Sequence, residues 1–200
     1  MQTDKTLSGD EKMNDTWDKL YGECASCTAC ELSKLRTNCV FGAGDKNADV
    51  LFIGEAPGDN EDRTGTPFVG RAGQLLDKYF TEVGISRESI YIANILKCRP
   101  PKNRDPLPSE EAACIGFLQR QIKLLNPKII VCLGRISAAK LIRPDFKITK
   151  EHGEWIEKDG ILMTAVYHPA LLLRDPRKKD DMLADMKKIK EKLDTVRGSF

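Results

Sequence analysis

The sequence lacks long apolar segments and secretion signals. No apolar run approaches the ~20 residues that a membrane-spanning helix needs. Residues 1–13 are polar and do not contain the apolar core of a signal peptide. These absences argue against membrane and secreted proteins. We therefore expect a protein of the cytoplasm that has no membrane partner and whose thiols stay reduced.

The sequence also has little charge imbalance and no sign of several domains. Its net charge of +2 does not by itself indicate nucleic-acid binding. Three basic clusters (97–99, 102–104 and 177–179) lie in predicted loops. They suit a phosphate backbone, and solvated surface charge explains each of them equally well. No repeat or linker is present, so we expect a frayed segment at 1–13 and a single domain at 14–200.

Strand patterns alternate with helical patterns along the chain. The predicted buried strands are 50–53, 90–96, 128–134 and 161–167, and the predicted helices are 15–20, 71–83, 109–125, 135–141 and 180–196. We expect an irregular hairpin at 147–158, with His152 on its surface. Alternating strands and helices are typical of a parallel sheet covered by helices. The sequence therefore predicts an α/β fold, a three-layer α/β/α sandwich with a central four-stranded, mainly parallel sheet.

An unusually long glycine-rich loop follows the first predicted strand. From residue 54 to residue 70 it reads GEAPGDNEDRTGTPFVG. Glycine and proline in its first residues force a tight turn and let a ligand approach the backbone. A loop of roughly 15 residues between a strand and a helix is typical of a functional segment. A glycine-rich turn alone would be better explained as a connection with a solvated acidic tip.

Seven cysteines in a chain with reduced thiols indicate metal or redox chemistry rather than disulfides. Three of them form a C-x2-C-x2-C run, whose spacing lets thiolates converge on one centre, namely Cys24, Cys27 and Cys30. Lys34 stands where a ferredoxin run would place its fourth cysteine, so Cys98 and Cys114 are the candidates for further ligands. Sulfur ligands suit zinc and an iron–sulfur cluster equally. Cys132 lies in an apolar strand and is expected to be a core residue.

Four motifs together resemble family 4 of the uracil-DNA glycosylase superfamily, the iron–sulfur, thermostable type. They are GEAPG with PFVG (54–70), CTACEL (27–32), the strand that ends near Asn94, and HPALLLR (168–174). The resemblance implies a structural [4Fe–4S] cluster, with zinc as the less favoured alternative. The ligands that it implies are Cys27, Cys30, Cys98 and Cys114. Cys24 and Cys39 depart from the family pattern.

The same resemblance implies a DNA repair glycosylase. Such an enzyme flips uracil out of single- or double-stranded DNA, hydrolyses its N-glycosidic bond and leaves an abasic site. A monomer is expected. Two alternatives stay open: a non-catalytic iron–sulfur DNA-binding module associated with replication, and a sibling glycosylase of broader base specificity.

Three side chains are implied as the walls of a uracil pocket. Phe68 would stack on the base, although a core phenylalanine is the simpler interpretation. The Asn94 amide would pair with N3–H and O4 of uracil, and its alternative role is to tie two loops together. His168 would donate a hydrogen bond to uracil O2 as charge develops on the leaving base. We expect this histidine to be catalytic.

The glycine-rich loop carries further implied roles. Ala56 stands where the best-known branch of the superfamily has a water-activating aspartate, so that base is absent. Glu55 is the candidate for orienting water or stabilising the sugar cation. Glu61 is expected near uracil C5, where it helps to exclude thymine, but the division of roles between these carboxylates stays open. Backbone N–H groups from Gly54 to Ala56 are expected to bind uracil O2.

The HPALLLR segment is implied to contact DNA. Leu172 would wedge into the duplex in place of the flipped base, and Arg174 would meet a phosphate. A leucine run that packs on the core is the competing interpretation.

Overall fold

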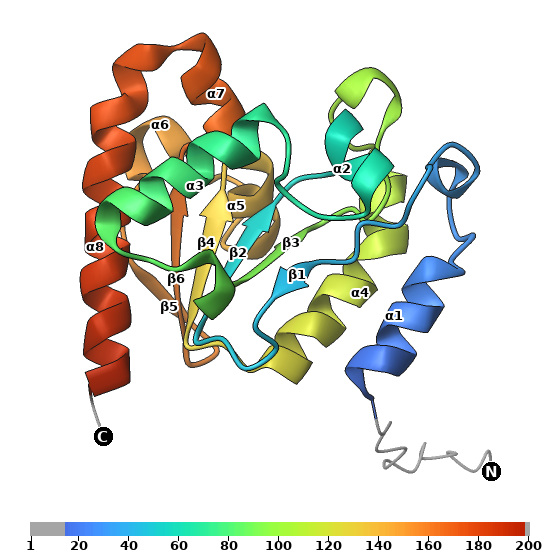
Figure 1. Cartoon of the computed structure of the whole chain (residues 1–200), viewed down its shortest axis with the longest axis horizontal. Coiled ribbons are helices and arrows are strands. Elements are labelled where there is room, and N and C mark those ends of the chain that lie inside the picture. Colours follow the sequence, from blue (N-terminus) through green and yellow to red (C-terminus); the bar gives the residue numbers. More distant parts are fainter. Residues whose placement is uncertain (1–14, 199–200) are drawn as a thin grey trace, which may run out of the picture.

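A computed structural model describes residues 15–198 of the chain (Figure 1). The prediction of a frayed segment at 1–13 lies outside the described residues. The structure contains a six-stranded sheet with the order β1-β3-β2-β4-β6-β5. Its strands are β1 (Ala43–Gly44), β2 (Val50–Gly54), β3 (Tyr91–Asn94), β4 (Ile129–Leu133), β5 (Ile156–Lys158) and β6 (Ile161–Val166).

The four central strands confirm the predicted parallel sheet. Strands β3, β2, β4 and β6 run parallel, whereas β1 and β5 pair antiparallel at the two edges. The predicted count of four was therefore too low. The edge strands are only two and three residues long, and their residues are half-exposed or exposed. Such short exposed strands carry no apolar pattern by which the sequence could predict them.

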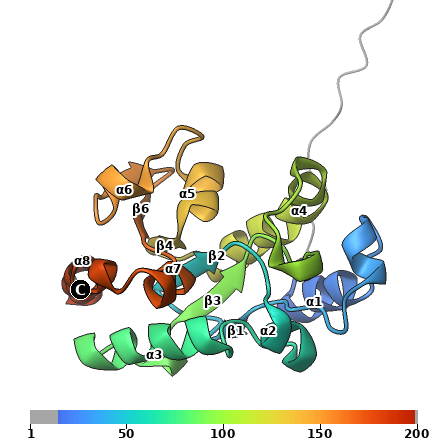
Figure 2. The ribbon, with the colours of Figure 1, turned by 90° about the horizontal axis from the view of Figure 1, so that it is seen from above.

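Helices cover both faces of the sheet, as Figure 2 shows from above. The helices are α1 (Trp17–Ala25), α2 (Asp59–Thr64), α3 (Arg71–Val83), α4 (Pro108–Leu125), α5 (Arg135–Leu141), α6 (Ile148–Glu151), α7 (Pro169–Arg174) and α8 (Lys179–Gly198). One face of the sheet packs on α3, α7 and α8, and the other packs on α4 and α5. The predicted three-layer α/β/α sandwich is confirmed.

The central strands are apolar throughout because both of their faces are buried. Phe52 of β2 faces α3, where its ring lies 4.9 Å from that of Phe80. Ile53, the next residue, faces the opposite layer and the cluster that contains Leu118 of α4. Each such side chain contributes about 1.5–3 kcal/mol through removal from water. This rigid centre fixes the positions at which the strands end.

Two segments differ from the sequence prediction. The acidic tip of the long loop is the helix α2, because carboxylates in a first turn favour helix formation. Residues 147–158 begin with the helix α6 and only then form the β5–β6 hairpin. His152 was predicted to be a surface residue, but it is half-buried and its Nδ1 lies 2.6 Å from Oδ2 of Asp185.

Among the helices of residues 15–198, none is both long and apolar enough to cross a membrane.

Candidate active site

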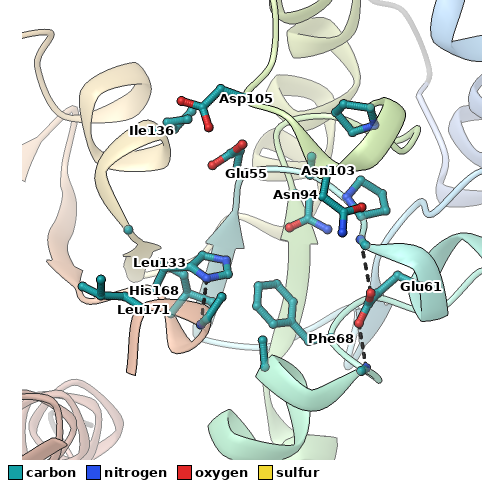
Figure 3. A pocket seen from close by; sticks show the side chains of 18 of the residues that line it. Glu55, Glu61, Phe68, Asn94, Asn103, Asp105, Leu133, Ile136, His168 and Leu171 are labelled. Carbon is teal, nitrogen blue, oxygen red and sulfur yellow. Dashed lines mark hydrogen bonds between the residues drawn. The ribbon is translucent and has the colours of Figure 1, made fainter. Parts of the chain in front are cut away.

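A cavity of about 570 Å³ opens at the carboxyl ends of the parallel strands. This edge is where parallel α/β sheets place their ligand sites. Four strands each deliver a residue to the cavity: Glu55 after β2, Asn94 at the end of β3, Leu133 at the end of β4 and His168 after β6. Phe68 lies in the same cavity, and Figure 3 shows Phe68, Asn94 and His168 around one space. Residues far apart in the sequence therefore meet here.

Phe68 is held in a backbone conformation that non-glycine residues rarely adopt. Its φ of 53° lies in the left-handed region. The Glu61 carboxylate supports this conformation by accepting hydrogen bonds from N–H of Val69 at 2.9 Å, Gly70 at 2.7 Å and Gly58 at 3.1 Å. Such strain persists only where the surroundings enforce it. Glu61 thus fixes the loop that presents the Phe68 ring (Figure 3).

Asn94 lies against Gly54, its partner on the neighbouring strand. A Cβ added to Gly54 would stand 2.3 Å from Asn94 Oδ1 and 2.6 Å from Phe68 Cζ, so only glycine leaves room for both side chains. Asn94 is 2% exposed. Its Oδ1 is buried and has no hydrogen-bond partner among the described residues. An unpaired buried acceptor of this kind costs about 1–3 kcal/mol unless a ligand supplies a donor.

His168 faces the Phe68 ring across the cavity. The two ring centroids are 5.8 Å apart with an angle of 36° between the planes. Burial lowers the pKa of His168 to about 4, and Arg174 lowers it further while Glu61 opposes the shift. The imidazole is therefore neutral near pH 7. Its Nδ1 accepts a hydrogen bond from the N–H of Ala170 at 3.1 Å, which assigns the proton to Nε2.

Glu55 lies at the opposite side of the cavity from Phe68. Burial raises the pKa of its half-buried carboxyl to about 7, Asp105 raises it further and Arg135 opposes the shift. Asp105 accepts a hydrogen bond from Nη2 of Arg135 at 3.1 Å, and Figure 3 shows the carboxylates of Glu55 and Asp105 near each other. Sequence reasoning singled out neither Asp105 nor Arg135. Asp105 lies in a proline-rich loop and Arg135 begins α5. No local pattern in the sequence predicts that these two segments lie side by side.

The predicted DNA wedge requires a correction. Leu172 is 0% exposed and packs in the core beneath α7. Its neighbour Leu173 is 41% exposed, and Leu171 lines the cavity. In a helix successive residues point in directions about 100° apart, so only one of three adjacent leucines faces the core. Arg174, the predicted phosphate contact, is exposed at the mouth of the same cavity.

The basic clusters also differ from expectation. Lys97 is only 1% exposed and does not lie at the surface at all. Arg99 pairs with Asp59. Arg104 binds both carboxylate oxygens of Glu110, at 2.6 and 2.9 Å. Arg99 and Arg104 therefore already form ion pairs within the protein.

Three of the four predicted cysteine ligands share one apolar cluster beyond the Asn94 turn. Cys98 and Cys114 are buried in one apolar cluster, and the half-buried Cys30 packs against it. Cys27 is also half-buried, three residues before Cys30. Within residues 15–198, no three potential ligand side chains are gathered closely enough to hold a single metal ion. Cys132 is fully buried in β4, which confirms its predicted place in the core.

A guanidinium and a backbone N–H donate hydrogen bonds to these thiols. Nη1 of Arg36 donates a hydrogen bond to Sγ of Cys98 at 3.1 Å, and the backbone N–H of Lys97 donates to Sγ of Cys114 at 3.3 Å. Burial lowers the pKa of Lys97 to about 8, while Cys114 and other thiols oppose that shift. Burial raises the pKa of Cys114 to about 11, and Lys97 opposes it. Burial outweighs the positive groups, so the pKa values of the free Cys98 and Cys114 thiols are raised.

Two further cysteines form a separate pair. The Sγ atoms of Cys24 and Cys39 lie 3.1 Å apart, one at the end of α1 and the other in the segment before β1. Neither belongs to the four predicted ligands.

Comparison with known proteins gives this arrangement a family. The model of the Uracil DNA glycosylase superfamily matches residues 41–194, and the chain belongs to that superfamily. Within it, the chain is similar to type-4 enzymes. It is 42% identical over 185 residues to the type-4 uracil-DNA glycosylase of Archaeoglobus fulgidus, a match that covers 88% of this chain and 93% of that one.

Two further relatives carry the same description. The type-4 uracil-DNA glycosylase of Sulfurisphaera tokodaii is 44% identical over 88% of this chain and 84% of its own length. That of Thermotoga maritima is 46% identical over 74% of this chain and 79% of its own. The family predicted from the four motifs is confirmed.

Proposed function

We propose that this chain is a uracil-DNA glycosylase, which flips uracil out of DNA and hydrolyses the bond between the base and deoxyribose. One observation carries the proposal. The cavity at the strand ends is bordered by a stacking ring, Phe68, a neutral donor, His168, and a buried amide, Asn94, whose oxygen lacks a partner within the described residues. A flipped uracil supplies a flat ring for Phe68, an acceptor oxygen for His168 and an N–H donor for the Asn94 oxygen.

Asn94 provides base selection. Its Oδ1 accepts from uracil N3–H while its amide N–H donates to O4. Cytosine presents the inverse pattern at these two atoms, so the same amide orientation leaves two groups unpaired against cytosine. A site built to hydrogen-bond its substrate rejects an analogue because its buried polar groups are then unsatisfied. Phe68 stacks on the base, an interaction worth about 1–3 kcal/mol.

His168 stabilises the leaving base. As the glycosidic bond breaks, negative charge develops on uracil O2, and the Nε2–H of the neutral imidazole donates to it. Backbone N–H groups of Gly54 and Ala56 add to this environment. A donor held in place before the reaction needs no reorganisation, and one such donor contributes about 2.7–4 kcal/mol to the rate.

The two carboxylates have different roles. Glu61 already accepts three backbone hydrogen bonds, which supports its assignment to holding the Phe68 loop and closing the space beside uracil C5. The half-buried Glu55 carboxylate accepts no hydrogen bond among the described contacts. We assign to it the orientation of water and the stabilisation of positive charge on the sugar. Since its pKa is about 7, a large fraction is ionised at neutral pH.

Residues at the mouth of the cavity are assigned the contacts with DNA outside the flipped base. Arg174 binds a phosphate of single- or double-stranded DNA. Leu173 takes the position that the sequence assigned to Leu172, because it is the exposed leucine of α7. Its side chain replaces the flipped base in a duplex.

A [4Fe–4S] cluster fits the donor set of Cys27, Cys30, Cys98 and Cys114. Four thiolates around a zinc ion or around an oxidised four-iron cluster would leave a net charge of about −2, which Arg36, hydrogen-bonded to Cys98, would partly balance. Cys30, Cys98 and Cys114 share one apolar cluster, and Cys27 precedes Cys30 by three residues, so these four would hold the group. When bound, the cluster links the N-terminal segment to the loop after β3. Glycosidic hydrolysis has no redox step for it to perform.

One assay tests the proposed function. Purified protein is incubated with single-stranded and duplex oligonucleotides that contain uracil, thymine or hypoxanthine, and abasic sites are cleaved with alkali. Cleavage at uracil alone is expected. Binding without release of free base would indicate the non-catalytic module, and cleavage at hypoxanthine would indicate broader specificity. A brown protein with absorbance near ~400 nm would show iron–sulfur rather than zinc.

A further inference from the structure

Lys97 is buried without a carboxylate partner. The side chain is almost wholly removed from solvent, and no ion pair of residues 15–198 includes it. Instead its Nζ donates to the main-chain oxygen of Asn94 at 2.8 Å and to Oε1 of Gln121 at 2.6 Å. A buried ammonium that has only neutral acceptors is costly, and a shorter apolar residue would fill this space more cheaply. Its position therefore calls for a role.

Gln121 fixes the ammonium from the other side. It is fully buried on α4, and its Nε2 donates to the main-chain oxygen of Phe41 at 2.9 Å and to the hydroxyl of Tyr91 at 3.4 Å. The amide is thus oriented with its oxygen toward Lys97. A buried network of this kind has one arrangement, because every alternative leaves a polar atom unpaired.

The acceptor of the Lys97 bond belongs to the residue that selects the base. Asn94 ends β3, and the bond from Lys97 closes the turn that follows the strand. The Asn94 carbonyl carbon is bonded to the Cα that also carries the side chain, so the hydrogen bond from Lys97 helps to hold the position of that Cα. A displacement of the main chain at Asn94 would therefore move the amide within the cavity.

The other polar contact of Lys97 reaches the thiols. Its N–H donates to Sγ of Cys114, and the next residue is Cys98. One residue thus joins two of the proposed cluster ligands to the strand end that carries Asn94.

We propose that Lys97 is a positioning residue for uracil recognition: its ammonium, fixed by Gln121, holds the Asn94 backbone so that the amide meets the base. This inference rests on the proposed function. It gives the thiol region a mechanical link to the base site, in addition to its part in stability.

Lys97→Met tests the link, because methionine fills a similar volume without the ammonium. The matched control is Lys78→Met, which removes an exposed lysine on α3. We measure kcat and KM on a uracil oligonucleotide, inhibition by free uracil, and iron content. For Lys97→Met we expect a roughly tenfold lower kcat and a roughly tenfold weaker inhibition by uracil, the scale of one charge-assisted hydrogen bond. KM for DNA and iron content are expected to match the wild type, since phosphate contacts and thiols are untouched.

Several outcomes overturn the inference. Unchanged inhibition by uracil in Lys97→Met would show that the amide does not depend on the ammonium. Loss of iron together with activity would make Lys97 a charge partner of the thiolates instead. Should Lys97→Met fail to fold, Gln121→Met takes its place. Inhibition by free uracil at the wild-type level in Gln121→Met would likewise overturn the inference. A wild-type protein that releases no uracil refutes the proposed function itself, which is a separate result.

Discussion

The base cavity and the thiol region are built in different ways. Four residues of the cavity stand at or just after strand ends, so the hydrogen-bonded register of the sheet places them. The four proposed ligands come from the segment after α1, the turn after β3 and the first turns of α4. No strand carries any of the four proposed ligands. The cavity is therefore preformed by the core, whereas the thiol region depends on what binds its sulfur atoms.

Charge distinguishes the two regions as well. Burial holds two groups of the cavity close to neutrality, because it lowers the pKa of His168 to about 4 and raises that of Glu55 to about 7. In the thiol region, the guanidinium of Arg36 contacts Cys98. Under the proposed function, the first region receives charge during the reaction, whereas the second balances the permanent charge of thiolates bound to a cluster. Variants in each should fail in different ways.

The largest effect is expected at His168. His168→Ala removes the donor to uracil O2, so the single-turnover rate should fall by about 10²–10³ while DNA affinity changes little. The iron content should stay at the wild-type value, which separates this loss from damage to the thiol region. His152→Ala is the control, because that histidine pairs with Asp185 away from the cavity. An unchanged rate in His168→Ala would remove this residue from the mechanism.

A thiol variant should show the opposite pattern. Cys98→Ser removes one proposed ligand, so iron should be lost and the protein destabilised by about 3 kcal/mol or more. Iron analysis and thermal unfolding measure both effects. Cys24→Ala is the matched control, since Cys24 pairs with Cys39 and should leave iron in place. Loss of iron in the control would instead assign the upstream ligands to Cys24 and Cys27.

Glu61 offers a smaller test inside the cavity. Glu61→Gln places an amide NH₂ where the carboxylate accepts backbone N–H groups, so the Phe68 loop should loosen. The expected cost is about 1–2 kcal/mol, or a roughly tenfold lower kcat, with unchanged iron content. Glu82→Gln on the exposed side of α3 is the control. Equal rates for the two variants would show that the loop keeps its shape without the carboxylate.

The smallest effect is expected at Glu55, whose titration should make both stability and activity depend on pH. Its pKa is raised from 4.5 to about 7, so the folded protein holds a proton that the unfolded chain releases in this range. The stabilisation from protonated Glu55 is present below pH 4.5 and is lost as the pH rises through 7. Activity should change in the other direction and rise a few-fold, to roughly three times its acid value, because the ionised carboxylate orients water.

Glu55→Gln should remove both of these dependences. Unfolding midpoints and single-turnover rates between about pH 5 and about pH 8 measure them. A variant that keeps the rise in rate would assign the titration to another group.

Much of the fold could be predicted from local sequence. The helix over residues 71–83 was predicted with the bounds that the structure gives, because apolar residues recur at helical spacing and Gly84 ends it in the left-handed conformation. The edge strands and α2 could not be predicted in the same way. Short exposed strands have no period, and α2 depends on the capping of Gly58 N–H by Glu61.

The sequence by itself determined the family, the four core strands and the candidates Phe68, Asn94 and His168 for the cavity, because motifs and periodic patterns are local properties. Only the tertiary structure decided that Leu172 is buried, that Lys97 lies in the core beneath Asn94, and that Asp105 meets Glu55. These outcomes depend on which segments pack against one another. A side chain's exposure and its charge state are set by neighbours that the order of residues along the chain does not reveal.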